Sequence, residues 1–191
     1  MTWKTEVEAL QSLLGAVSFC NKAGKGMAAE KGFQSWCRLT GKVSAGHRAI
    51  YLIGNGASAS MASHFAADLA KNARLHTQVF TDLSLVTAVS NDMGFEHVFA
   101  EPLKRRGVKG DMLVAISSSG KSPNILKAVD VARRLGLVVV TLSAMSPENP
   151  LRAAGDLNIH VSAVTYGHAE SCHAAILHHW MNRMEKMLKP H

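Results

Sequence analysis

The feature that most constrains the fold is a change of pattern near residue 49. From there on, short apolar and β-branched runs alternate with longer stretches of helical spacing. The expected strands cover residues 50–53, 77–81, 112–117, 138–142 and 157–161. Such alternation predicts parallel strands joined by right-handed crossovers, with helices on both faces of the sheet. The sequence therefore predicts an α/β fold built on a five-stranded parallel sheet.

The segment before this pattern has a different character. Apolar residues from about position 5 to position 45 follow helical spacing, and Gly24-Lys25-Gly26 interrupts them. An N-terminal helical hairpin is therefore expected over residues 1–46, followed by an α/β core over residues 47–191. The stretch from about 169 to 188 is expected to form one long helix. Because 191 residues fit one compact domain, we expect a single domain.

Composition excludes several classes of protein. A hydrophobic fraction of 47% supports a packed core, and no apolar run approaches the roughly 20 residues that span a bilayer. The N-terminal residues lack the order of a signal peptide, and the three cysteines are widely spaced. A cytoplasmic location without a membrane partner is therefore expected. The net charge of +7 comes from scattered basic residues without interleaved aromatic ones, so nucleic acid is not an expected partner.

Two Gly/Ser-rich turns each follow an expected strand and precede an expected helix. The first is Gly54-Asn55-Gly56-Ala57-Ser58, and the second runs from Ser117 to Pro123. Glycine lets the backbone adopt positive φ and approach a ligand closely, while serine hydroxyls join the free N–H groups at a helix N-terminus. Proline fits the first turn of a helix, where its missing N–H costs nothing. Both turns have the composition of a phosphate cradle.

Either turn alone is equally well explained as an ordinary strand-to-helix turn capped by serine. Together they stand at the carboxyl ends of parallel strands, where open α/β sheets bind ligands, and this favours function. Neither turn matches GxGxxG or GxxxxGK(S/T), so a dinucleotide or P-loop site is disfavoured. We therefore expect a sugar-phosphate ligand.

Two further groups of side chains have the chemistry of metal ligands. His64 and Asp68 are four residues apart, so a helix would present both on one face. Such a pair is more often a solvated or structural contact. The segment from His168 to His179 concentrates histidine together with glutamate and cysteine. Either a metal site or a surface histidine cluster would explain that concentration.

Residues 51–188 resemble the sugar isomerase (SIS) domain family, and within it the phosphoheptose isomerases. The resemblance rests on GNGASASMASHFAADL, VSNDMGFEHVF, ISSSGKSPNILKAV and a histidine-bearing last helix. It implies an SIS-domain fold of flavodoxin-like topology that binds phosphosugars. By this resemblance, the substrate-binding residues are Asn55, Gly56, Ser58, Asp92, Ser117, Ser118, Ser119, Ser122 and Glu170.

The resemblance also implies a zinc site, with another divalent metal as the alternative. Its ligands would be His64, Asp68, Glu170 and His178, with Asp68 as the catalytic base and His178 as the acid. A regular helix separates Glu170 from His178 by about 12 Å along its axis. Either an irregular first turn or a neighbouring subunit would have to reconcile the two, and His173 is an alternative ligand.

Three positions depart from the family pattern, which usually has Glu at position 68, Gln at position 170 and an acidic residue at position 61. Here these positions hold Asp68, Glu170 and Met61. Asp68 reaches one methylene less far, Glu170 adds a negative charge, and Met61 removes a polar group. The departures leave open a different phosphosugar, a different metal, or a member that binds without catalysing.

The resemblance implies a metal-dependent aldose–ketose isomerase that converts sedoheptulose 7-phosphate to D-glycero-D-manno-heptose 7-phosphate in bacterial heptose synthesis for lipopolysaccharide or capsule. One alternative is an isomerase of another phosphosugar. The other is a non-catalytic protein that resembles the replication-initiator-binding branch of the family. A homotetramer is expected, because the N-terminal helices and the last helix carry apolar faces that one thin sheet cannot cover.

Overall fold

The computed structural model describes residues 2–188, and all helices and strands below lie within that range. The helices are α1 (Trp3–Gly15), α2 (Ala29–Ala45), α3 (Ala57–Ala73), α4 (Leu83–Met93), α5 (Ala100–Arg106), α6 (Pro123–Leu135) and α7 (Tyr166–Leu188), with 3-10 turns η1 (Phe95–His97) and η2 (Pro150–Ala153). The strands are β1 (Ser18–Asn21), β2 (Gly26–Met27), β3 (Ile50–Ile53), β4 (Thr77–Gln78), β5 (Met112–Ser117), β6 (Val138–Ala144) and β7 (Leu157–Val161).

These strands form one sheet in the order β2-β1-β7-β6-β5-β3-β4. From β4 to β7 all neighbours are parallel, whereas β1 is antiparallel to both β7 and β2. The α/β fold and all five expected strands are confirmed. The number of strands was wrong, because the sheet has seven rather than five. The parallel part has the strand order of flavodoxin-like sheets, with a topological switch point between β3 and β5.

The two additional strands replace the expected N-terminal helical hairpin, which was wrong. Residues 5–45 do contain two helices, but the β1–β2 hairpin separates them, and Gly24 makes its turn with a φ of 74°. Phe19 points from β1 into the core and is only 2% exposed. The free edge of β7 offers unpaired backbone groups, and pairing with them outweighs the local helical spacing of residues 18–21.

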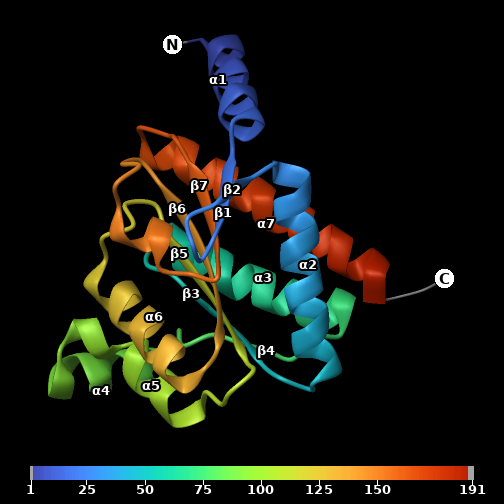
Figure 1. Cartoon of the computed structure of the whole chain (residues 1–191). Coiled ribbons are helices and arrows are strands. Elements are labelled where there is room, and N and C mark those ends of the chain that lie inside the picture. Colours follow the sequence, from blue (N-terminus) through green and yellow to red (C-terminus); the bar gives the residue numbers. More distant parts are fainter. Residues whose placement is uncertain (1, 189–191) are drawn as a thin grey trace.

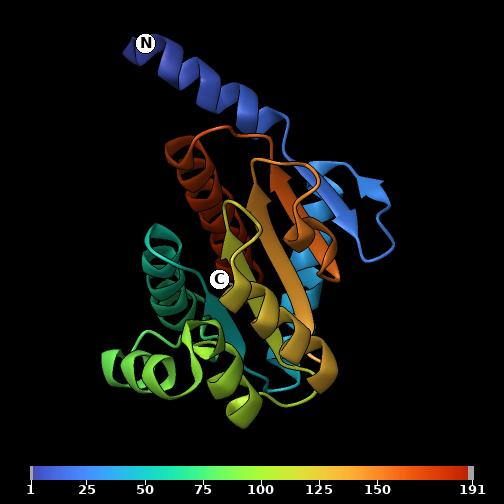
Figure 2. The ribbon, with the colours of Figure 1, turned by 90° about the vertical axis from the view of Figure 1, so that its left-hand side faces the viewer.

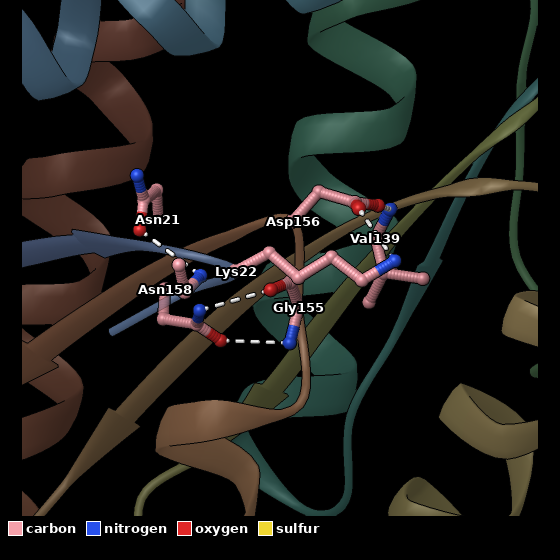
Figure 3. A network of polar contacts seen from close by, with 7 residues as sticks. Asn21, Lys22, Val139, Gly155, Asp156 and Asn158 are labelled. Carbon is pink, nitrogen blue, oxygen red and sulfur yellow. Dashed lines mark hydrogen bonds and ion pairs between the residues drawn. The ribbon is translucent and has the colours of Figure 1, made fainter. Parts of the chain in front are cut away.

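A polar network links the β1–β2 hairpin to the residues just before β7 (Figure 3). The Asp156 carboxylate accepts a hydrogen bond from the Val139 backbone N–H at 2.9 Å and lies 3.7 Å from the Lys22 ammonium. Next to it, the Asn158 side chain accepts from the Gly155 N–H at 2.8 Å and donates to the Gly155 carbonyl at 3.0 Å. Lys22 in the hairpin turn is thereby linked to the start of β7.

Helices cover both faces of the sheet (Figure 1). On one face, α2, α3 and α7 bury the larger apolar cluster, in which the Trp36 and Trp180 rings stack 4.2 Å apart. The Trp180 indole N–H donates to the Thr40 hydroxyl at 3.2 Å, so this polar group is satisfied inside the core. On the other face, α5 and α6 pack on the second cluster. The predicted last helix is confirmed and begins a few residues early, at Tyr166.

The first helix projects from the body of the molecule (Figures 1 and 2). None of its residues, all of which the structure describes, is buried, and Trp3 is 79% exposed. It meets α7 where the Glu6 carboxylate lies 2.8 Å from His168 Nε2. Within residues 2–188, no helix is both long and apolar enough to cross a membrane.

Candidate functional site

Both predicted turns lie at the switch point of the sheet. The first follows β3 and the second follows β5, and these two strands are neighbours in the sheet. Between the turns and the start of α7 lies a pocket of about 160 Å³. Its lining residues are Asn55, Ser58, Ile116, Ser117, Ser118, Ser119, Ser122, Tyr166 and Glu170. Seven of the nine predicted substrate-binding residues are therefore brought together, by fold positions more than a hundred residues apart in the chain.

Close packing shapes the first turn. A Cβ atom on Gly54 would come within 2.6 Å of the Ser58 backbone, so only glycine fits there. Gly56 precedes α3 with a φ of 54°, in the left-handed region that favours glycine. Ser58 is buried and lines the pocket from the first turn of α3. The helix therefore presents its N-terminal end at the pocket, with the partial positive charge that attracts anions.

The Asn149 side chain packs closely against Gly120 of the second turn. Gly120 adopts a φ of 63°, and a Cβ atom there would clash with the Asn149 side chain. Asn149 in turn donates to the Ser146 carbonyl at 2.7 Å. At the front of the turn, the Ser117 hydroxyl accepts from the Gly120 N–H at 3.2 Å and lies 3.3 Å from the Ser122 hydroxyl. These hydroxyls meet where α6 begins with Pro123.

The two turns are joined by a pair of side-chain amides. Asn55 donates to the Asn124 side-chain oxygen at 2.9 Å, and Asn124 donates back to the Asn55 oxygen at 2.8 Å. Sequence reasoning missed Asn124, because this partnership spans 69 positions in the chain. It also missed Tyr166, an exposed residue at the start of α7 whose only sequence signal is its position just before the histidine-rich segment.

Two predicted substrate contacts are not among the described residues that line the pocket. Gly56, although part of the first turn, is exposed and does not line the pocket. Asp92 lies near the end of α4, also exposed, where its carboxylate accepts from the Asn91 side chain at 2.9 Å. The substrate-binding roles of all nine residues remain predictions, and for Gly56 and Asp92 the pocket gives no support.

The predicted base, Asp68, and the predicted acid, His178, lie on α3 and α7, two helices that pack against each other. His64 Nε2 lies 3.4 Å from Asp68 Oδ2, one turn further along α3. The His178 ring approaches from α7, with its centroid 5.8 Å from that of His64 and 4.7 Å from that of Phe65. Two imidazoles and a carboxylate, which are donor types that zinc favours, thus lie on two helices that pack against each other.

The fourth predicted ligand lies elsewhere. Glu170 lines the pocket, and α7 is already helical at that position, so the irregular first turn considered as an explanation is absent from the described chain. His173, the alternative ligand, is fully buried, and its Nε2 lies 3.2 Å from the Ser143 carbonyl. Among residues 2–188, no three His, Cys, Asp or Glu side chains lie close enough together to hold a metal ion. The donor types fit zinc, but the single chain does not assemble the full set.

Met61, which stands where the family usually has an acidic residue, is a core residue here. Its partly buried side chain on α3 packs against the larger apolar cluster. His173 on α7 is buried more completely, and this burial lowers its pKa to about 4, which favours the neutral imidazole. Of the three departures from the family pattern, only Glu170 places a charge in the pocket itself.

The structure is thus an open α/β domain with a hydroxyl-lined pocket between two helix N-termini at the switch point of its sheet, a position whose polarity favours an anion. The family model described as "SIS domain" matches residues 30–144, more than half of the chain. The chain therefore belongs to the SIS domain family, as the sequence motifs predicted.

Curated relatives share this family and a common name. A phosphoheptose isomerase of Bradyrhizobium sp. (strain ORS 278) is 42% identical over 53% of this chain and 54% of its own length. One of Campylobacter concisus is 32% identical over 74% of this chain and 78% of its own. The chain thus spans about half the length of the Bradyrhizobium relative. The solved structure of phosphoheptose isomerase GmhA from Neisseria gonorrhoeae superposes with a TM-score of 0.80 at 25% identity, covering 96% of this chain and 95% of that one.

Proposed function

We propose that this protein is an aldose–ketose isomerase that converts sedoheptulose 7-phosphate to D-glycero-D-manno-heptose 7-phosphate. The observation that carries the proposal is the position of the pocket, whose wall is formed by the same two helices that bear Asp68 and His178. A phosphosugar whose phosphate occupies the pocket would extend along these helices. The names of the relatives support the choice of substrate.

The phosphate end of the substrate provides affinity and orientation. Serine hydroxyls from the second turn, together with backbone N–H groups at the starts of α3 and α6, would donate to the phosphate oxygens. Fixing one end of a flexible sugar phosphate keeps its carbonyl end near the catalytic groups, which lowers the entropic cost of reaction.

The isomerisation moves one proton between neighbouring carbons. Asp68 would remove a proton from C1 of the ketose, while His178 gives a proton to the C2 oxygen, and an enediol results. Return of the first proton to C2, with loss of the proton from the C1 hydroxyl, gives the aldose. The Asp68 carboxylate is 21% exposed, so it is partly shielded but accessible to substrate.

We also propose that the enzyme uses zinc, or another divalent metal, held by His64, Asp68, Glu170 and His178. Bound there, the metal would polarise the substrate oxygens and stabilise negative charge as the proton leaves carbon. The donor types of this set support the assignment. In the described part of one chain no three such side chains lie close enough to hold an ion. This, together with the exposed apolar residues of α1, supports a homotetramer in which a neighbouring subunit completes the site.

One experiment tests catalysis and metal use together. The purified full chain is incubated with sedoheptulose 7-phosphate, with added zinc or with a chelator, and aldose phosphate is followed by NMR. Bound metal is measured by elemental analysis, and the oligomeric state by light scattering. We expect turnover that the chelator abolishes and zinc restores. No turnover in any sample would refute the isomerase proposal, and turnover by metal-free protein would refute the zinc proposal alone.

A second candidate function is the isomerisation of a different phosphosugar. Glu170 favours it, because a carboxylate in the pocket changes which sugar hydroxyls can be accepted there. The same assay on a panel of five-, six- and seven-carbon ketose phosphates separates the candidates. A higher kcat/KM for a shorter sugar would replace the heptose with that substrate.

A further inference from the structure

The amide pair between the two turns has a fixed direction. An amide side chain can be turned over without changing its shape, so its hydrogen-bond partners decide which end is oxygen. Here the Ile125 backbone N–H lies 3.0 Å from the Asn124 side-chain oxygen and also 3.1 Å from the Ser122 carbonyl. A backbone N–H can only donate, so the Asn124 atom that faces it must be oxygen.

The orientation of Asn124 then determines that of Asn55. With its oxygen toward Ile125, Asn124 also accepts from the Asn55 amide nitrogen, and its own nitrogen points at the Asn55 oxygen. If Asn55 were turned over, two N–H groups would face each other, and so would two oxygens. The backbone at the start of α6 therefore fixes the amide orientation of a residue in the other turn.

The two residues differ in their access to the ligand. Asn55 lines the pocket and is only partly buried. Asn124 is 2% exposed and is not among the described residues that line the pocket. The pair uses one N–H and one lone pair of the Asn55 amide, so one N–H and one lone pair remain for a ligand.

We infer that Asn124 is a positioning residue of the phosphosugar site. It does not touch the ligand but fixes which edge of the Asn55 amide faces it, and it holds the first turn in register with the second. This inference rests on the proposed function only in that a phosphosugar occupies the pocket, since it requires binding and not turnover.

A purely structural role for Asn124 would give a different result, and a double-mutant cycle separates the two. The variants are Asn124→Ala, Asn55→Ala, the double variant and Asn124→Asp, with Asn182→Ala on the exposed surface of α7 as the control. Asn124→Asp retains an acceptor for Ile125 but cannot donate to Asn55. Calorimetry measures the dissociation constants of sedoheptulose 7-phosphate and inorganic phosphate, and thermal unfolding shows whether each variant is folded.

Asn55→Ala and Asn124→Ala are each expected to bind sedoheptulose 7-phosphate about tenfold more weakly, the size expected from losing one or two directed hydrogen bonds. The double variant should be no weaker than the weaker single one, because Asn124 acts through Asn55. Asn124→Asp should also bind weakly while remaining folded, and Asn182→Ala should bind like the wild type.

Additive losses, or wild-type affinity in folded Asn124→Ala and Asn124→Asp, would overturn the inference. So would a wild-type chain that binds neither ligand. A chain that binds the phosphosugar with the expected coupling but never isomerises it would instead refute the proposed function and leave the positioning role intact.

Discussion

His64 Nε2 and Asp68 Oδ2 lie 3.4 Å apart across one turn of α3, next to the His178 ring on α7. Helix geometry alone brings His64 and Asp68 together, because a spacing of four residues places both side chains on one face of α3. Lys71 lies on the same helix, 3.9 Å from the other Asp68 oxygen. The Asp68 carboxylate thus lies between the His64 imidazole and the Lys71 ammonium.

Asp68→Asn is expected to lower kcat for sedoheptulose 7-phosphate at least about 100-fold, because the amide cannot accept a proton from carbon. The dissociation constant of the phosphosugar should stay within about threefold, since the pocket residues are unchanged. Calorimetry and the NMR turnover assay measure the two quantities. Asp130→Asn, on the exposed face of α6, is the matched control and should behave as wild type. Full activity of Asp68→Asn would move the base elsewhere, with Glu170 as the first alternative.

Glu170→Gln is expected to tighten binding of inorganic phosphate about threefold or more at low salt, because it removes a like charge from the pocket. The effect should shrink as ionic strength rises. The same variant should bind zinc more weakly if Glu170 is a ligand. Titration calorimetry with phosphate and with zinc tests both statements, and Glu148→Gln, at an exposed position outside the lining of the pocket, controls for net charge. Weaker phosphate binding would show that Glu170 orders the pocket rather than opposing the anion.

Gly120→Ala is expected to lower the free energy of unfolding by about 2 kcal/mol or more. Alanine is strained at a φ of 63°, and its Cβ atom would clash with Asn149, which is buried. Urea denaturation measures the change. Gly167→Ala is the control, since a Cβ atom there meets nothing within 4 Å and alanine favours the first turn of α7. Equal stability of the two variants would contradict the packing described for the second turn.

Stability is expected to fall as the pH drops from about 6.5 toward 4. Burial lowers the pKa of His173 from 6.5 to about 4 in the folded state, so the unfolded chain binds more protons across this window. The stabilisation is complete above pH 6.5, and its full loss would correspond to about 3 kcal/mol. Urea midpoints between pH 4 and 7 measure the slope. His173→Gln should flatten it and the exposed His47→Gln should not, whereas an unchanged slope in His173→Gln would assign the effect to other groups.

Much of the fold could be predicted because its signals are local. The strands β3, β5 and β7 could be predicted from the apolar runs of a few consecutive residues that form them. The β1 strand gives no such signal, since its longer pairing is with β7, about 140 positions away, and its local partner β2 has only two residues. Whether its four residues form strand or helix depends on that distant edge, which no local pattern contains.

The candidate site divides in the same way. The serines and glycines of the two turns could be predicted, because their composition reflects backbone geometry at each turn. Asn124 could not, because it is an ordinary residue of a helix first turn until the fold brings Asn55 to it. The separation of Glu170 from His178 along α7 was also foreseeable from helix geometry alone, whereas the packing of His178 against Phe65 depends on how α7 lies across α3.

The sheet ends on both sides in a strand of only two residues, β2 on one edge and β4 on the other. Edge strands this short have too few unpaired backbone groups to pair stably with a strand of a second molecule. Copies of this chain therefore have little means of joining edge to edge into fibres. Resistance to edge-to-edge aggregation therefore depends on the two ends of the sheet, whereas the exposed apolar residues of α1 lie on a helix that projects away from them (Figure 1).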